Sequence, residues 1–332
     1  MKNSLVIMSG KGIIVKHNGK RIALDPNKST DADVTFVSHA HIDHLHTPED
    51  GERILTSSET SKLASARGYN MEKYDESLDG FELIDSGHIL GSKGLLINDK
   101  VFYTGDVSVR DRAFLKGAKI PKCEILILES TYGKPEFKFP NIKEIADNAN
   151  KIISNLYSKG VPVILMGYPL GKAQVLTSMF KHWAPVYLHD SVYRMNKVYN
   201  DLGIDLGDAI SYSQAEQDNL LRKRPWIMVA PKMSSHSKFV LDMKDRYNAV
   251  TIGFSGWALT NWYKYSSGLD YTLPLSDHCD FDELISIVKK CNPSKVYTFH
   301  GYSAELAMQL NRLGYDSEPL ARESLLHYMN GD

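Results

Sequence analysis

The sequence predicts an α/β protein in which one α/β domain is inserted into another. Short apolar runs typical of strands crowd the first 130 residues, whereas strand and helix patterns alternate after Pro140. Side chains that commonly bind metals lie before residue 130 and again after residue 276. Because candidate ligands occur in both flanking parts, we expect these parts to fold together around the inserted segment.

The first 130 residues predict a series of short strands. Turn sequences such as Asn18-Gly19 and Asn98-Asp99 separate the apolar runs. One helix is expected at 57–68, with Ser58 as its cap. Strands are expected at 5–8, 12–15, 22–24, 34–37, 81–84, 94–97, 101–103 and 125–128.

After Pro140 the pattern becomes an alternation of helices and strands. Helices are expected at 142–158, 172–182 and 192–202, and strands at 161–166, 186–188, 227–230 and 249–252. This alternation predicts a parallel sheet. From residue 273 a helix at 281–290, a strand at 295–299 and a helix at 304–313 close the chain.

The most informative motif directly follows the run 34–37. It places His39, His41, Asp43 and His44 within six residues. Zinc prefers imidazole nitrogens and carboxylate oxygens in roughly tetrahedral arrangements. A short loop with these four side chains can bind one metal with two of them and a second metal with the other two. A lone His-x-His is common on surfaces, but the four-residue pattern is rare.

Composition excludes several classes of protein. A hydrophobic content of 42% and a charged content of 24% are typical of soluble globular proteins. Three cysteines without a paired spacing, no signal-peptide pattern and no apolar run of membrane-spanning length predict a cytoplasmic protein that does not bind membranes. Because the net charge is −1, any nucleic-acid surface must be a local patch.

Four further segments place a histidine or aspartate beside an apolar run. His88 ends the segment 85–88, Asp106 ends 103–106, His278 ends 276–278, and His300 follows the strand expected at 295–299. Each of these residues alone is more typical of an ordinary loop or turn. Their recurrence beside the His-x-His-x-Asp-His motif favours a larger metal site.

Together these segments resemble the metallo-β-lactamase superfamily and, within it, the β-CASP nucleases. The matching segments are 38–44, 87–92, 103–106, 129–133, 168–174, 276–278 and 300–301. The resemblance covers essentially the whole chain. It implies a metallo-β-lactamase αββα sandwich for 1–133 and 273–332, with a β-CASP domain at 134–272 that caps the metal cleft.

The resemblance also implies two zinc ions, with manganese as an alternative. One ion would be held by His39, His41, His88 and Asp106, and the other by Asp43, His44, Asp106 and His300. A hydroxide between the metals would attack phosphorus in line. His278 would act as the general acid and Glu129 would orient it. Asp43 is expected to serve in catalysis as well as in metal binding.

Two features of the inserted segment have a structural and a functional interpretation. Gly171 and Lys172 open a helix, and a helix N-terminus with a lysine suits phosphate binding, although a plain helix start fits equally well. Trp257, Trp262 and Tyr263 could stack on bases, but core packing is the favoured interpretation.

Within the family the chain most resembles ligase-associated DNA exonucleases, through 275–278 and 300–302. The implied function is exonucleolytic repair of single-stranded DNA, with a DNA ligase or a helicase as partner. Segments 87–92 and 129–133 also resemble RNA 3′-end processing nucleases, so RNA is the alternative substrate. A lactamase- or glyoxalase-type hydrolase is more remote, because small substrates need neither an inserted domain nor the Glu129/His278 pair.

Overall fold

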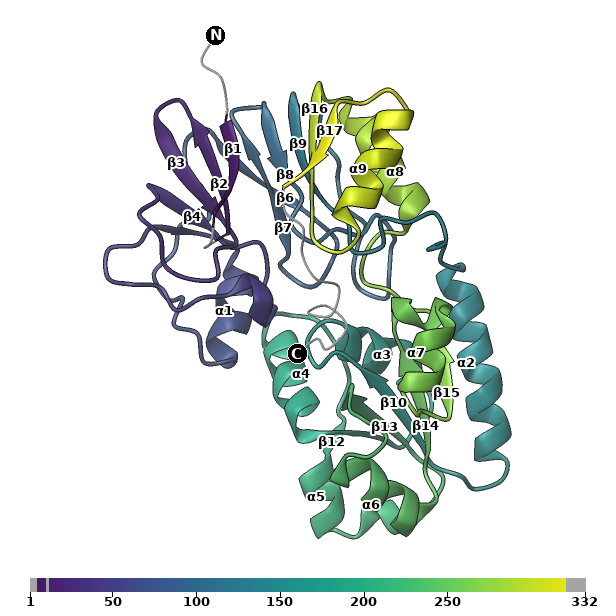
Figure 1. Cartoon of the computed structure of the whole chain (residues 1–332). Coiled ribbons are helices and arrows are strands. Elements are labelled where there is room, and N and C mark those ends of the chain that lie inside the picture. Colours follow the sequence, from purple (N-terminus) through teal and green to yellow (C-terminus); the bar gives the residue numbers. More distant parts are fainter. Residues whose placement is uncertain (1–4, 10–11, 321–332) are drawn as a thin grey trace. The chain divides into compact units, whose positions relative to one another are not determined.

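The computed structural model describes residues 5–9 and 12–320 (Figure 1). The chain divides into two compact units. The first unit contains residues up to 111, residues 115–138 and residues from 278 onward, and the second contains 112–114 and 139–277. The second unit is therefore inserted into the first. Their assignment as metallo-β-lactamase and β-CASP domains stays a prediction.

The first unit contains a five-stranded sheet in the order β1-β2-β3-β4-β5. Its strands are β1 (Leu5–Ser9), β2 (Gly12–His17), β3 (Lys20–Leu24), β4 (Val34–Phe36) and β5 (Ile54–Leu55). The first three strands are antiparallel neighbours, whereas β3, β4 and β5 run parallel. The carboxyl ends of β3 and β4 therefore lie at the same edge of this sheet.

A second, six-stranded sheet has the order β17-β16-β9-β8-β7-β6. Its strands are β6 (Phe81–Asp85), β7 (Lys93–Ile97), β8 (Val101–Tyr103), β9 (Ile125–Glu129), β16 (Lys295–Phe299) and β17 (Ser317–Pro319). The strands β8, β9, β16 and β17 are parallel neighbours. Residues far apart in the sequence are thereby brought to one edge of the sheet.

Two apolar cores cover the two faces of this second sheet. Side chains alternate between the faces of a strand, so Ile127 belongs to one core while Leu126 and Leu128 belong to the other. The core around Ile127 joins the two sheets, whereas the other packs against α8 (Phe281–Cys291) and α9 (Ser303–Arg312) (Figure 1). Each fully buried leucine or isoleucine contributes roughly 1.5–3 kcal/mol to this packing.

The second unit has a parallel six-stranded sheet in the order β12-β11-β13-β10-β14-β15, which confirms the predicted parallel pairing. Its strands are β10 (Val163–Gly167), β11 (Val186–Leu188), β12 (Ile210–Ser211), β13 (Ile227–Pro231), β14 (Val250–Phe254) and β15 (Tyr271–Leu273). Its helices are α2 (Ile142–Tyr157), α3 (Lys172–Phe180), α4 (Asp190–Asp201), α5 (Tyr212–Gln217), α6 (Lys238–Tyr247) and α7 (Asn261–Ser266). Short 3-10 helices add η2 (Leu220–Arg222) and η3 (Gly256–Leu259).

The predicted cap of one helix differs from the structure, and some elements, helix α6 among them, were not predicted. Helix α1 (Ser58–Ala66) is capped by Ser57 and not by the predicted Ser58, because the Ser57 hydroxyl accepts the amide of Thr60 at 3.1 Å. Helix α6 was not predicted, although it buries Val240, Met243 and Tyr247 at helical spacing. Its remaining positions are mostly charged, which hid this apolar face.

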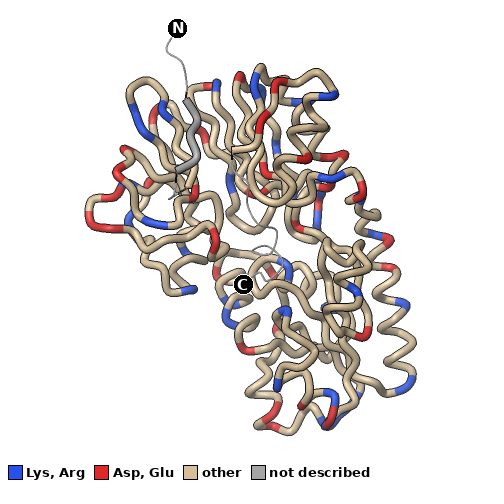
Figure 2. Tube along the Cα trace, viewed as in Figure 1, with Lys and Arg blue, Asp and Glu red and all other residues tan. Residues whose placement is uncertain are grey.

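Charged residues of the two signs are mixed along the chain. Lys and Arg are interspersed with Asp and Glu along the trace of both units (Figure 2), in agreement with the net charge of −1. Among the described helices, none combines the length and the apolar character that a membrane crossing requires.

Candidate metal centre

The candidate ligands of the first unit follow the carboxyl ends of its strands. His39, His41 and His44 come after β4, with His44 at the end of the 3-10 helix η1 (Ile42–His44). Asp106 follows β8, and His300 follows β16. Because the parallel strands β8, β9 and β16 end at one edge, their loops converge there.

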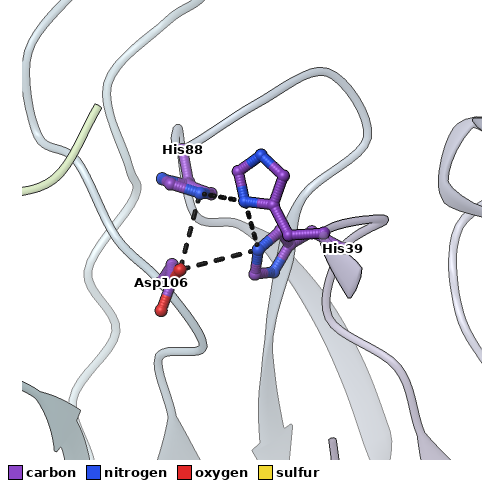
Figure 3. Close-up of side chains that lie close together, drawn as sticks. His39, His88 and Asp106 are labelled. Carbon is purple, nitrogen blue, oxygen red and sulfur yellow. Dashed lines mark hydrogen bonds and ion pairs between the residues drawn. The ribbon is translucent and has the colours of Figure 1, made fainter. Parts of the chain in front are cut away.

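Four side chains form the first ligand group, namely His39, His41, His88 and Asp106. The Nδ1 atom of His41 lies 3.0 Å from Nε2 of His39 and 3.1 Å from Nε2 of His88. Both Nε2 atoms lie 3.5 Å from Oδ2 of Asp106, and dashed lines in Figure 3 mark these two contacts. Ligands bound at about 2.0–2.1 Å around a tetrahedral metal lie about 3.4 Å apart. The four atoms therefore fit one divalent ion.

A second group combines His44, Asp106 and His300. Nε2 of His44 lies 3.6 Å from Oδ2 of Asp106, and Nδ1 of His300 lies 3.8 Å from Oδ1 of Asp106. Among the described residues, the buried atoms Nε2 of His44 and Oδ1 of Asp106 have no hydrogen-bond partner. Such orphaned atoms are costly unless a ligand satisfies them, so this group also fits a metal ion.

Asp43 lies at the rim of this second group. Its Oδ2 atom is 3.6 Å from Nε2 of His44, and its side chain is 38% exposed. None of the groups of converging ligand atoms among the described residues includes Asp43. Its carboxylate therefore does not meet the side chains of His44, Asp106 and His300 at one point. The structure thus brings six of the seven predicted metal ligands into two groups around Asp106 and places the seventh beside them.

Asp25 is a site residue that the sequence analysis missed. Its Oδ2 atom accepts hydrogen bonds from Ser38 Oγ at 2.5 Å and Tyr103 Oη at 2.8 Å, and it lies 2.8 Å from Nδ1 of His44. A carboxylate on the far nitrogen fixes a metal-binding imidazole in orientation. The only sequence signal was an acid directly after β3, before Pro26, which is also typical of a turn.

The electrostatics of the cluster favour a bound cation. Burial acts to lower the pKa of His44, but Asp106, Asp43 and Asp25 outweigh it and raise this pKa well above its ordinary value. Burial and then His44 lower the pKa of His39 well below its ordinary value. For Asp106, burial acts to raise the pKa, but His44, followed by His278, His300 and His88, holds it well below the usual range. These directions favour an ionised Asp106 and a neutral His39, which suits metal binding, whereas His44 would have to release a proton to bind a metal.

Beside the ligands, Glu129 holds His278. The Glu129 carboxylate is fully buried and lies 2.8 Å from Nδ1 of His278. It also accepts the amide of Val107 at 2.9 Å, and the amide and hydroxyl of Thr131 at 3.1 and 2.6 Å. The His278 ring lies 4.6 Å from that of His88, centroid to centroid. A rigidly oriented imidazole is therefore placed next to the first ligand group.

Known proteins similar to this chain include ligases and ribonucleases. A probable DNA ligase from Opitutus terrae is 30% identical over 88% of this chain, which spans 29% of the ligase's length. From Methanocaldococcus jannaschii, a probable RNase MJ4 is 25% identical over 86% of this chain and 85% of its own length. An RNase J-like protein of the same organism is 23% identical, with 81% of each chain covered.

A solved structure shares the fold. A protein of unknown function from Enterococcus faecalis V583 superposes with a TM-score of 0.65 at 14% identity, covering 97% of this chain and 98% of that one. No protein-family model matches the sequence. The relatives that are matched over most of their length, together with the order of the site segments along the chain, decide the assignment. The chain belongs to the β-CASP nuclease family of the metallo-β-lactamase superfamily.

In this β-CASP chain, glycines stand next to two of the ligands. Gly105 has φ 54°, and a Cβ atom there would lie 2.8 Å from Cβ of Ser38. Gly301 has φ 51°, and a Cβ atom there would lie 2.5 Å from Cα of Thr131. Both positions require glycine, so that the loops can approach each other closely enough to bring the ligands together.

The predicted phosphate contact at Gly171 and Lys172 differs from the geometry of the second unit. The Lys172 side chain is buried, and its Nζ atom lies 3.1 Å from Oδ2 of Asp277 and donates to the carbonyl of Leu275 at 2.8 Å. The amide of Gly171 donates to Oε1 of Gln174 at 2.7 Å. Protein groups therefore already bind the Lys172 ammonium and the Gly171 amide, which favours the plain helix start, and the phosphate contact stays a prediction.

Proposed function

We propose that this protein is a metal-dependent nuclease that hydrolyses phosphodiester bonds of nucleic acid, and specifically a DNA exonuclease of DNA repair. One observation carries the proposal. Two ligand groups share Asp106, and the Glu129–His278 pair lies directly beside them. A phosphodiester needs a nucleophile, charge stabilisation and a proton for its leaving oxygen, and these groups suit all three tasks.

Two zinc ions fit the ligand types of the two groups. His39, His41, His88 and Asp106 would hold one ion, and Asp43, His44, Asp106 and His300 the other. Bound there, divalent ions would supply a nucleophile at neutral pH and positive charge for the phosphoryl oxygens. The ionised Asp106 would position both ions, and Asp25 would keep the ring of His44 turned toward them.

His278 would protonate the leaving oxygen. Because its Nδ1 atom is engaged with Glu129, the proton would be delivered from Nε2. The Glu129 carboxylate favours the charged imidazolium, which is the form that can donate. A thiolate leaves without a proton, whereas the alkoxide of a phosphodiester is a poor leaving group until it is protonated, so the pair favours a phosphodiester over a thioester.

The relatives support both nucleic acids, and DNA is favoured. The DNA ligase relative shares 30% identity, and its matching segment is part of a longer protein. This supports a repair role in which the protein works with a DNA ligase, or with a helicase that supplies single strands. The two RNase relatives, at 25% and 23% identity, support RNA 3′-end processing as the second candidate.

Parallel digestion of end-labelled single-stranded DNA and RNA tests the proposal. We expect the DNA to be shortened progressively. The Asp106→Ala protein should be inactive on both DNA and RNA, because it loses a residue shared by the two ligand groups. Unchanged activity of this variant would overturn the nuclease assignment. Faster cleavage of RNA would transfer the proposal to the second candidate.

Two further measurements define the metal and the bond. Metal analysis of the purified protein, followed by reconstitution of the chelated protein with zinc or manganese, should show the highest activity with zinc. Bis-p-nitrophenyl phosphate should be hydrolysed, whereas a thioester and a β-lactam should not. Hydrolysis of either of the latter compounds with no phosphodiesterase activity would point to a lactamase- or glyoxalase-type enzyme.

A further inference from the structure

Exposed aromatic side chains gather in one short stretch of the second unit. Among the described tryptophan, tyrosine and phenylalanine residues, three have exposed side chains. They are Trp262, which is 53% exposed, Tyr265, which is 86% exposed, and Tyr271, which is 41% exposed. All three lie within ten residues of each other. Aromatic side chains are usually buried, so three exposed rings in one stretch mark a binding surface.

This stretch is held firmly by its inward residues. Trp257 of η3 and Tyr263 of α7 are each only 4% exposed, so the expected core packing is correct for them and wrong for Trp262. The hydroxyl of Thr260 caps α7 by accepting the amide of Tyr263 at 3.2 Å and donates to the carbonyl of Trp257 at 2.8 Å. The outward rings therefore stand on an anchored support, which lowers the entropy cost of binding.

Trp262 and Tyr265 share one face of α7. They are three positions apart, which places side chains on the same side of a helix. Tyr271 lies on β15, the edge strand of the parallel sheet. Flat rings with a polar N–H or O–H edge present faces on which a nucleobase can stack.

The charge around these rings suits a polyanion. Asp270 is the only acidic residue from 255 to 275, and its carboxylate is used by Lys244 at 2.9 Å and by the hydroxyl and amide of Thr251. Lys264 of α7 is exposed, and Lys232 is half-buried with its ammonium 5.4 Å from the ring centroid of Tyr263. Within the described chain, no carboxylate lies at ion-pair distance from either lysine. Of the two, the exposed Lys264 is the cation that a phosphate group can reach.

We propose that the face of α7 that carries Trp262 and Tyr265 is a base-stacking site for single-stranded nucleic acid. The proposal rests on the nuclease function and specifies the form of its substrate. Bases of a single strand expose their faces, whereas those of a duplex are already stacked on their neighbours. The rings would hold unpaired bases, and the exposed Lys264, on the neighbouring side of the helix, would contact the backbone.

Binding of a labelled oligothymidylate to the full chain, in the presence of a chelator to prevent cleavage, tests this site. We expect the double variant Trp262→Ala/Tyr265→Ala to bind about tenfold or more weakly, because stacked aromatics contribute strongly to single-strand affinity. Phenylalanine at both positions should restore most of the affinity, because a phenyl ring also stacks. The control Leu241→Ala removes a 48% exposed apolar side chain from α6 and should bind like the unchanged protein.

The salt dependence tests the cation separately. Lys264→Gln should lower the slope of log affinity against log salt by about 0.7, the value for one phosphate contact of a single strand. The control Lys151→Gln, at an exposed position of α2, should leave the slope unchanged. Unaltered affinity in the double alanine variant would overturn the proposal. The proposal would also be overturned if the double alanine variant lost self-association, measured by sedimentation, but still bound single strands. That outcome would mean that the rings form a contact between protein molecules.

The test separates this inference from the nuclease function. Bis-p-nitrophenyl phosphate has no nucleobases, so its hydrolysis should be the same in the α7 variants and in the unchanged protein. Normal hydrolysis together with unaltered oligonucleotide binding would refute the stacking site alone. Absence of any phosphodiesterase activity in the unchanged protein would refute the nuclease proposal, whereas the binding measurement would still decide the stacking site.

Discussion

At the scale of single residues, the site depends on how side chains are held as much as on which are present. Asp106 takes part in both ligand groups, and His278 is fixed by a buried carboxylate with three further hydrogen bonds. The proposed ligands and the proposed proton donor His278 thus occupy separate positions of one cluster, although Asp106, Glu129 and His278 also converge closely enough to hold an ion. Substitutions should therefore separate metal binding from proton transfer.

His278→Ala should reduce kcat about 10²–10⁴-fold while both metals stay bound. The physical reason is that the variant loses the donor for the leaving oxygen but keeps every residue of the two ligand groups centred on Asp106. Steady-state kinetics combined with metal analysis checks this expectation. Loss of one metal equivalent would instead make His278 a ligand, and the roles of acid and ligand would have to be exchanged.

Asp25→Asn should weaken metal binding about 10–100-fold, because it removes the charge that orients His44. At saturating metal, kcat should stay close to that of the unchanged protein. Competition with a metal-binding indicator measures the affinity. The matched control is Asp31→Asn, which alters an exposed carboxylate paired with Arg21 at the surface. Equal affinities for the two variants would show that Asp25 does not act through His44.

The difference between Asp25 and the other site residues shows what the sequence can reveal. His39, His41, Asp43 and His44 could be recognised because their clustering is local and improbable by chance. Asp25 acts through contacts with Ser38 and Tyr103, which are 13 and 78 positions away. A single acid before a proline carries no such signal, so only the three-dimensional structure assigns it to the site.

At the scale of elements, the loop after β8 is tied to the start of α8. Arg110 donates from Nε to Glu283 at 2.6 Å and from Nη2 to Asp280 at 2.5 Å. Asp280 also caps α8, and Cys279 donates its amide to the carbonyl of Val107 at 2.9 Å. These contacts position the segment that carries His278 relative to the segment that carries Asp106.

Arg110→Met should lower the free energy of unfolding by about 1–3 kcal/mol, because two largely buried carboxylates lose their charged partner. Urea denaturation measures the change. The control Arg53→Met breaks an ion pair with Asp75 in which the arginine side chain is 56% exposed and the aspartate side chain 38%. This substitution should lower the free energy of unfolding by about 1 kcal/mol or less. Similar losses in both variants would mean that burial does not distinguish the two pairs.

The elements also show where sequence patterns fail. The strands β11 and β16 were predicted with their observed bounds, because each is a compact apolar or β-branched run with clear ends. The strands β5, β12 and β17 were not predicted, because β5 and β12 have only two residues and β17, Ser-Glu-Pro, contains no apolar run. Their positions are set by pairing with neighbours that lie elsewhere in the sequence.

At the scale of the whole molecule, the two units carry different chemistry and different optical probes. Every residue of the ligand groups belongs to the first unit. All four tryptophans, Trp183, Trp226, Trp257 and Trp262, belong to the second unit. Tryptophan fluorescence therefore follows the unfolding of the second unit, whereas calorimetry detects both units.

Chelation should lower the unfolding temperature of the first unit and leave the tryptophan transition unchanged. A metal that binds only the folded state stabilises it by about 2.7 kcal/mol at a hundredfold excess over Kd, and its removal also leaves buried atoms of His44 and Asp106 unsatisfied. Calorimetry and fluorescence of the same sample, with and without chelator, measure the two effects. The Asp106→Ala protein, which lacks the shared ligand, should show a much smaller chelator effect. If the tryptophan transition shifts together with the calorimetric one, the two units unfold as a single cooperative body. If chelation does not shift the calorimetric transition, no metal stabilises the first unit.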